Sequence, residues 1–341
     1  MPAAEQLPPF TLRVERRVLH FRTPARTSGG ALRERTVFYV HAETAFGTGT
    51  GECCTMPHLS PEAGADYEAR LRAACAEAER RQALPTEGAA FPSSFRFGLE
   101  CALAEACFPQ HPLWHSPVAR GEAGIRLHHL IWMNTAEQML AQMEAGIARG
   151  FTCLKMKVGA LPFAEELALL REARRRYPHA ELRVDANGAF HNAAEAAEKL
   201  RQLADCGVAW IEQPLPWAQR EQTAELAALN ILPVALDEAL MAPAGHAERE
   251  RLLDTVRPQG IVIKPSLHGG LSGAEDWAAL AAARGIRWWV NSALESHVGL
   301  RRLLLWCGLR APQELHGLGT GLLFTDDEPA TELRGDALFV R

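Results

Sequence analysis

Five ionisable residues stand at or just beyond the ends of short apolar runs in the second half of the chain. They are Lys157, Asp185, Glu212, Asp237 and Lys264, in the stretches TCLKMKV, ELRVDAN, AWIEQPL, PVALDEA and GIVIKPS. Charged side chains are almost never fully buried unless they are paired or bind a metal. Five of them in such surroundings indicate a site in which opposite charges, or a metal ion, compensate one another.

The three carboxylates have the chemistry of a magnesium site. Three close anions repel one another, and their pKa values rise unless a cation lies between them. Hard oxygen ligands without sulfur or paired histidines suit Mg²⁺, with Mn²⁺ as a substitute. We therefore predict that Asp185, Glu212 and Asp237 bind Mg²⁺; Glu238, expected on the opposite face of its strand, is the less favoured ligand. The alternative is that these acids cap the following helices or pair with the lysines.

Lys155 and Lys157 lie two positions apart and therefore point to the same face of a strand. A divalent cation and partial burial both lower the proton affinity of a lysine, so that the neutral amine can act as a general base. Lys264 comes from the sixth predicted strand and Lys157 from the second, which places them on opposite sides of the site. A carboxylate substrate between them could lose its α proton to a lysine while the metal stabilises the enediolate.

The elements that must position these residues repeat at near-regular spacing. β-rich runs end near residues 133, 157, 185, 212, 237, 264, 291 and 318, with steps of 24 to 28 residues. Each step has room for a strand, a helix of about 12 residues and two short loops. Eight such units predict a (β/α)₈ TIM-type barrel, an α/β fold whose active site lies at the C-terminal ends of the strands.

The first 120 residues lack this period and predict an α+β capping domain over residues 1–120. Strands are expected near residues 10–21 and 36–45, with helices near 60–81 and 93–107. The glycine clusters at 29–30 and 47–51 predict flexible loops, and residues 109–117 a linker. The barrel domain is predicted over residues 121–318. Residues 319–341 are predicted to pack back on the capping domain.

Composition bounds the class of partner. The 341 residues are 48% hydrophobic and 23% charged with a net charge of −5, which excludes a disordered chain and gives no attraction for nucleic acid. The eight cysteines contain no CxxC pair, which favours reduced, buried thiols. A basic start followed by an apolar run is missing, as is any apolar run of about 18 residues. We therefore predict a cytoplasmic protein without membrane association, whose partner is a small-molecule carboxylate.

The order K-x-K, DANG, IEQP, LDE and IKPS resembles the muconate-lactonising branch of the enolase superfamily. Further stretches, among them GECCTMPHLSPE, PSSFRFGLECAL, WWVNSALESHVGL and HGLGTGLLFTDD, resemble its o-succinylbenzoate synthase family, particularly Bacteroidetes-type sequences. The likeness covers nearly the whole chain. It implies a capped barrel and a magnesium-dependent lyase of menaquinone biosynthesis, which dehydrates 2-succinyl-6-hydroxy-2,4-cyclohexadiene-1-carboxylate to o-succinylbenzoate.

The resemblance also implies roles for the charged residues. Lys157 would remove the α proton and then return a proton to the departing hydroxide on the same face. Lys264 would stay cationic over the ring of the anionic intermediate. Lys155 would keep a positive charge near the carboxylate and lower the proton affinity of Lys157. The three carboxylates match the metal ligands of the family.

Residues at the rim of the site are predicted to contact the substrate. Ser292 could donate a hydrogen bond to a carboxylate, with a helix N-cap as the alternative. Glu295 matches a position at the same rim. Gly319, Thr320 and Gly321 offer backbone N–H groups for the succinyl carboxylate.

Two glycine-rich segments, residues 28–30 and 51–58, are predicted to close over the mouth of the barrel and exclude water. Met56 and His58 are candidates for contact with the succinyl arm. Arg183, on the same strand face as the first metal ligand, is predicted either to help position the ligands or to fill the barrel interior.

Other functions remain open on the same residues. An N-succinylamino acid racemase or a dipeptide epimerase would use Lys157 and Lys264 as acid and base on opposite faces. A dipeptide's ammonium group would need a charged partner after the last strand, where Asp326 and Asp327 lie only downstream. Alternatives from other classes are a barrel that binds a carboxylate without turnover and a Schiff-base aldolase that uses one lysine without a metal.

Overall fold

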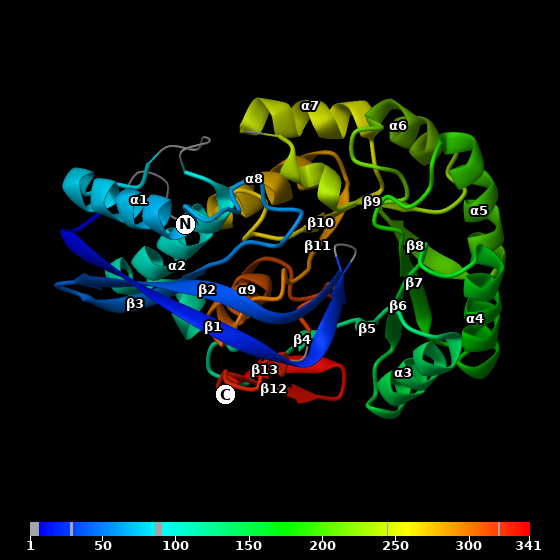
Figure 1. The fold of residues 1–341 in the computed structure, drawn as a ribbon, viewed down its shortest axis with the longest axis horizontal. Helices are drawn as coiled ribbons and strands as arrows, with labels where there is room; N and C mark the ends of the chain where they lie inside the picture. Colours follow the sequence, from blue (N-terminus) through cyan, green and yellow to red (C-terminus); the bar gives the residue numbers. More distant parts are fainter. Residues whose placement is uncertain (1–6, 28–29, 86–90, 244, 320) are drawn as a thin grey trace.

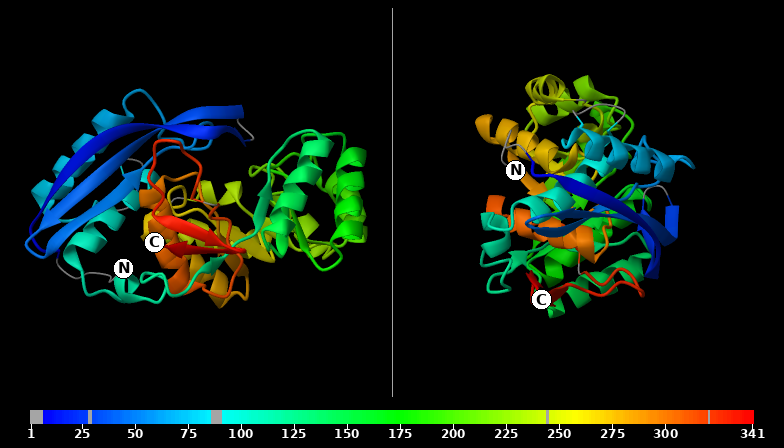
Figure 2. Two further views of the ribbon diagram at one scale, coloured as in Figure 1. Left: turned by 90° about the horizontal axis from the view of Figure 1, so that it is seen from below. Right: turned by 90° about the vertical axis from the view of Figure 1, so that its left-hand side faces the viewer.

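The computed structural model of the chain describes residues 7–27, 30–85, 91–243, 245–319 and 321–341. In these ranges a sheet-and-helix unit built by the N-terminal part of the chain lies beside a ring of alternating strands and helices (Figure 1). In the left view of Figure 2, the long blue strands lie at one side of the molecule and the green helices of the ring at the other. The fold is a capped (β/α) barrel, as the sequence predicts.

The capping unit is a three-stranded antiparallel sheet packed on two helices. Its strands are β1 (Phe10–Thr27), β2 (Gly30–Thr44) and β3 (Gly47–Cys53), in that order, and its helices are α1 (Tyr67–Arg81) and α2 (Ser93–Cys107). The buried side chains of this unit include Phe38, Tyr67 and Phe95. The predicted helix over residues 93–107 is confirmed in full.

The prediction of a flexible loop at residues 47–51 is wrong, because these residues form β3. The glycines there serve close packing instead of flexibility. A Cβ atom at Gly51 would lie 1.9 Å from the carbonyl oxygen of Gly98, and one at Gly49 would lie 2.2 Å from that of Ala102. Helix α2 can approach β3 only because these positions carry no side chain.

Seven parallel strands in sequence order form most of the barrel wall: β5 (His129–Ile131), β6 (Cys153–Lys157), β7 (Glu181–Asp185), β8 (Val208–Glu212), β9 (Val234–Leu236), β10 (Gly260–Ile263) and β11 (Arg287–Val290). The eighth predicted strand, ending near residue 318, is reduced to two isolated bridges. His316 pairs with Leu127 on one side, and Gly317 pairs with Asn291 on the other. These bridges join β11 back to the first strand of the barrel.

The helices cover the outside of the ring: α3 (Ala136–Ala148), α4 (Phe163–Arg176), α5 (Ala193–Asp205), α6 (Arg220–Ala228), α7 (His246–Val256), α8 (Gly270–Ala283) and α9 (His297–Arg310). Each buries one face against the strands, as α5 does with Leu200 and Leu203. Asn192 caps α5 by accepting a hydrogen bond from the Glu195 amide at 2.9 Å. Two short 3₁₀ helices, η1 (Pro112–His115) and η2 (Glu238–Met241), lie in the connections.

The C-terminal segment contacts both parts of the molecule. Phe324 forms a bridge with Phe21 of β1. The following hairpin, β12 (Thr331–Arg334) and β13 (Ala337–Val340), pairs instead with β4 (Ile125–Arg126), just ahead of the first barrel strand. The domain limits at residues 120 and 318 stay a prediction.

All eight cysteines are free and buried, as predicted. Among the helices of the described ranges, none combines the length and the apolar character that crossing a membrane would need.

Candidate active site

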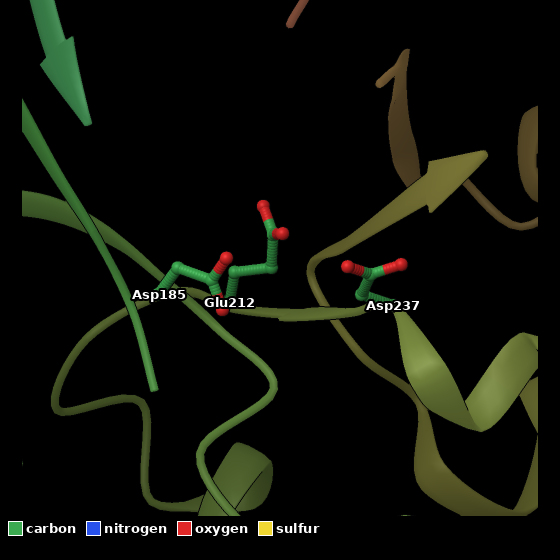
Figure 3. Close-up of side chains that lie close together, drawn as sticks. All are labelled: Asp185, Glu212 and Asp237. Carbon is green, nitrogen blue, oxygen red and sulfur yellow. The ribbon is translucent and has the colours of Figure 1, made fainter. Parts of the chain in front are cut away.

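Three carboxylates meet where neighbouring parallel strands end. Asp185 is the last residue of β7 and lies in register with Glu212, the last residue of β8, while Asp237 directly follows β9. One carboxylate oxygen from each lies within 4.8 Å of the others, and all three residues are at most 3% exposed. Figure 3 shows Glu212 between the other two. The structure therefore brings the three predicted metal ligands together.

The donor set fits a hard divalent cation. The Oδ1 atom of Asp237 is buried and accepts no hydrogen bond from any described residue. Leaving a buried acceptor unpaired is costly, and a cation among the carboxylates would remove that cost. Glu238 lines the cavity that lies above these carboxylates. The sequence predicts that Glu238 points to the opposite face of its strand, but β9 ends at Leu236 and Glu238 begins η2.

Lys155 and Lys157 share one face of β6, as predicted, and both contact Asp185. Their Nζ atoms lie 3.0 Å and 3.2 Å from Asp185 Oδ2. Lys155 also donates to Glu212 Oε1 at 2.5 Å, whereas Lys157 donates to Asn187 Oδ1 at 2.6 Å. The two lysines thus have different partners: Lys155 joins two carboxylates, and Lys157 is held by one carboxylate and one amide.

Asn187 was missed at the level of sequence, although it stands in the DANG stretch. Its Nδ2 donates to Glu238 Oε1 at 2.9 Å, and its backbone amide donates to Asp185 Oδ1 at 3.0 Å. Its φ of 44° is left-handed, a conformation that asparagine tolerates better than most residues. The signal was the polar residue beside a turn glycine at a strand end.

Lys264 lies across the cavity from Lys157. It follows β10, pairs with Asp237, and lines the same cavity as the two lysines of β6. A ligand in this cavity is therefore exposed to amines from two sides.

The lysines compensate only part of the negative charge, because burial and the neighbouring Asp185 still raise the pKa of Glu212 well above its usual range. Burial opposes ionisation of Lys155, but the facing carboxylates, Asp185 first, outweigh it and raise its pKa. Burial also opposes ionisation of Lys264, but the surrounding carboxylates, Asp237 first, together outweigh it and raise its pKa. Burial likewise opposes ionisation of Asp185, yet Lys155 and Lys157 hold its pKa well below its usual range. The lowered proton affinity predicted from the sequence is therefore wrong for Lys155 and Lys264 in this structure, because carboxylates surround their amines.

A cavity of about 450 Å³ opens above these charges. Its floor is lined by Lys155, Lys157, Asp185, Glu212, Glu238 and Lys264, and much of its wall is apolar. The apolar lining includes Met56, Leu59, Leu130, Trp132, Leu294, Leu318 and Leu323. The cavity thus pairs a charged end with an apolar space large enough for a ring and a short arm.

Of the predicted substrate contacts, Ser292, Gly319, Met56 and His58 line the cavity. Glu295 and Gly321 do not. Thr320, Ser28 and Gly29 lie outside the described residues.

Ser292 is engaged in a turn beneath the cavity wall. It donates to Glu295 Oε2 at 2.6 Å and accepts from the Leu294 amide at 2.9 Å. The alternative that Ser292 caps the next helix is wrong, because α9 begins at His297 and Ser296 accepts from the Val298 amide. A one-turn misplacement of the helix start caused the error.

Arg183 fills the barrel interior. Its guanidinium lies over the ring of Trp289, 4.9 Å from the centroid, and donates to Glu181 Oε1 at 2.6 Å. It is 2% exposed and makes no hydrogen bond to the three carboxylates within the described ranges.

His128 and Asn291 form a second support of the carboxylate cluster. A ring nitrogen of His128, Nε2, lies 3.3 Å from Asn291 Oδ1, and Asn291 Nδ2 lies 3.5 Å from Glu212 Oε1. Burial lowers the pKa of His128 well below its usual range, so the ring is neutral. The pair supports the central carboxylate of the cluster.

Comparisons with known proteins agree with this geometry. The family model described as "Enolase C-terminal domain-like" matches residues 138–308. The o-succinylbenzoate synthase of Desulfotalea psychrophila is 38% identical, over 92% of this chain and 94% of its own length. The chain belongs to the enolase superfamily and, within it, to the o-succinylbenzoate synthase family of lyases.

Similarity to solved structures also covers nearly the whole chain. The crystal structure of MenC from Desulfotalea psychrophila superposes with a TM-score of 0.80 and 33% identity, over 97% of this chain and 99% of that one. The L-Ala-D/L-Glu epimerase of Bacillus subtilis superposes with a TM-score of 0.83 at 19% identity, over 99% of this chain and 97% of that one, which shows a shared fold. The N-succinyl-L-Arg/Lys racemase of Bacillus cereus is 26% identical over 58% of this chain and 55% of its own length.

Proposed function

We propose that this member of the o-succinylbenzoate synthase family dehydrates 2-succinyl-6-hydroxy-2,4-cyclohexadiene-1-carboxylate to o-succinylbenzoate, as a cytoplasmic step of menaquinone biosynthesis. The observation that carries the proposal is the position of Lys157. Its amine borders the cavity beside the three carboxylates and is held there by Asp185 and Asn187. The similarity to the Desulfotalea psychrophila enzyme over nearly the whole chain supports the choice of reaction.

Asp185, Glu212 and Asp237 would hold the magnesium ion. Mg²⁺ bound there would offset the negative charge that develops on the substrate carboxylate as the α proton leaves. Lys155 lies between two of these side chains, at 3.0 Å from Asp185 and 2.5 Å from Glu212. It keeps a fixed positive charge beside the site.

Lys157 is proposed as both base and acid. It takes the proton from the carbon α to the ring carboxylate, and the electron pair of that C–H bond moves onto the carboxylate to give an enediolate, from which it later returns to form the new ring C=C bond. The C–O bond to the hydroxyl group then breaks, and Lys157 returns the proton to the departing oxygen on the same face, which releases water. The product ring is aromatic, so the elimination is downhill once the α proton has left.

Lys264 has a different role in this proposal. Asp237 pairs with it and raises its pKa, so it remains an ammonium group at neutral pH. A cation on the far side of the cavity stabilises the anionic ring of the intermediate without transferring a proton. The backbone of Gly319 borders the cavity and is suited to the succinyl carboxylate.

A second candidate is racemisation of an N-succinylamino acid, which one observation favours. Lys157 and Lys264 border one cavity from β6 and β10, the arrangement that proton exchange on two faces requires. Dipeptide epimerisation has less support. Asp326 binds the backbone amide of His20 and Asp327 that of His297, and neither lines the cavity.

Direct assays separate these candidates. The cyclohexadiene substrate should aromatise with a change in ultraviolet absorbance, at a rate well above racemisation of N-succinylamino acids and dipeptides. Lys264→Arg should reduce dehydration less than any racemisation, because only racemisation needs this lysine as an acid or base. Equal losses in both reactions would contradict the role assigned to Lys264, and no aromatisation by the wild type would contradict the proposed function.

A further inference from the structure

Arg35 of β2 is a buried cation of the capping sheet that contacts two separate segments. It is 5% exposed. Toward the barrel, its guanidinium donates to the carbonyl oxygens of Ala293 and Leu294, the latter at 2.7 Å. Toward its own unit, it donates to the carbonyl oxygen of Thr55 at 3.2 Å and to Cys54 Sγ at 2.9 Å. One side chain thus joins the segment after β3 to the segment after β11.

Both segments line the catalytic cavity. Met56 and His58 follow the first contact, and Ser292 and Leu294 belong to the second segment. Met56 packs with Ala293 in one buried cluster, with Leu294 against it. We call these two segments, residues 54–59 and 292–296, the roof of the cavity. Arg35 lies directly behind this roof and ties its halves together.

The roof contains a strained residue at the point that Arg35 holds. Leu294 has a φ of 64°, which is unfavourable for any residue with a branched side chain. Such a conformation persists only where the surroundings hold it. Its amide donates to Ser292 Oγ, and its carbonyl oxygen accepts from Arg35. Loss of Arg35 removes one of these two constraints.

The second roof segment is also anchored to the residues around the site. Glu52, fully buried on β3, accepts from the Ser296 amide at 3.0 Å and from its hydroxyl at 2.6 Å. Glu295 accepts from Ser266 Oγ at 2.6 Å, and Ser266 lies two residues after Lys264. The roof is therefore linked both to the capping sheet and to the strand end that carries the second cavity lysine.

We propose that Arg35 is a positioning residue, which sets the roof over the charged floor and so couples docking of the capping sheet to completion of the substrate cavity. Arg35 does not line the cavity and touches no group that reacts. A planar guanidinium suits this role, because it can donate in several fixed directions at once. The kinetic part of this inference rests on the proposed function.

The test compares Arg35→Met with a matched control, Arg302→Met. Arg302, on α9, is also 5% exposed and also crosses to the capping unit, where it donates to the carbonyl oxygen of Thr50 at 3.1 Å and pairs with Glu105. It does not line the catalytic cavity. Arg35→Met should raise the KM for the cyclohexadiene substrate by about tenfold or more, with a smaller change in kcat. Arg302→Met should leave KM unchanged, and both variants should bind Mn²⁺ as the wild type does.

Hydrogen exchange measured without substrate tests the coupling between the capping sheet and the roof independently of activity. Exchange should become faster in both residues 54–59 and residues 292–296 in Arg35→Met, but not in Arg302→Met. If Arg35→Met does not fold, Arg35→Lys is compared with Arg302→Met instead, because lysine keeps the charge but lacks the planar guanidinium group. Unchanged exchange, or the same KM in both variants, would overturn the inference. A wild type without dehydratase activity would contradict the proposed function alone, while the exchange result would still decide the coupling.

Discussion

The floor and the roof of the cavity are built in opposite ways. The floor consists of charged side chains at or just beyond the ends of consecutive parallel strands, with one or two of them placed by each βα unit. The roof consists of two loops far apart in the chain, which line the cavity with both apolar and polar side chains. Buried polar contacts from the capping sheet hold it in place. Chemistry is therefore concentrated where the backbone is most regular, and the enclosure of the substrate depends on contacts between the two parts of the molecule.

The largest effect should come from removing the metal. A chelator should abolish dehydration, and added Mg²⁺ or Mn²⁺ should restore it, because the three floor carboxylates would then lack their shared cation. Asp185→Asn should weaken Mn²⁺ binding measured by calorimetry. Full activity in the presence of chelator would show that the floor works without a metal.

Lys157→Ala should reduce kcat by about 10²- to 10⁴-fold, the usual contribution of a general acid–base group. Unfolding and Mn²⁺ binding should stay close to wild type, because Lys155 still compensates Asp185 and Glu212. Lys199→Ala, on the outer helix α5, is the control and should retain activity. Retention of most of the rate in Lys157→Ala would exclude this lysine as the base.

Asn187→Ala tests the support of the base. Loss of the 2.6 Å contact to Lys157 should lower kcat by about 10- to 100-fold, as supporting residues of such sites usually do. Asn187→Asp keeps an acceptor for the amine but replaces the donor to Glu238 by a second carboxylate, so it should recover only part of the loss. Steady-state kinetics of the two variants would show whether the contact matters, and equal rates for both would argue against it.

A change in the roof should affect KM and stability, whereas the changes in the floor affect kcat. Met56→Ala removes a buried side chain that packs with Leu267 and Ala293, so the free energy of unfolding should fall by about 2 kcal/mol or more. The KM should rise while kcat changes little. Denaturant unfolding and steady-state kinetics of the variant would test this. A fall in kcat as large as in the floor variants would contradict the difference between floor and roof.

The smallest effect concerns a pair away from the cavity. Asp327 accepts hydrogen bonds from His297, and this contact raises the pKa of His297 above 6.5. A histidine whose pKa is raised on folding contributes stability that is present below its unfolded pKa and lost as the pH rises through its folded pKa. Asp327→Asn should therefore lower stability by about 1 kcal/mol or less at acidic pH, with the difference fading above neutrality. Unfolding curves over that range would test this.

Much of the floor could be predicted from the sequence because parallel strands present their ends at one edge. The spacing of the β-rich runs placed Lys157, Asp185 and Glu212 in register before any contact was known. The same reasoning failed for Glu238, because a strand pattern does not reveal that β9 ends at Leu236. It also missed Asn187, which reaches Lys157 only through a left-handed turn.

The sequence by itself determined the periodic barrel, the identity of the charged floor residues and their order, since these follow from local pattern and strand direction. Tertiary structure decided the rest. Gly49 and Gly51 are positions of close packing in a strand. Ser292 and Glu295 form a hydrogen bond with each other, and Arg35 forms hydrogen bonds with a loop more than 250 residues away in sequence. Such contacts depend on how elements far apart in the sequence pack against one another. No local sequence pattern specifies that packing.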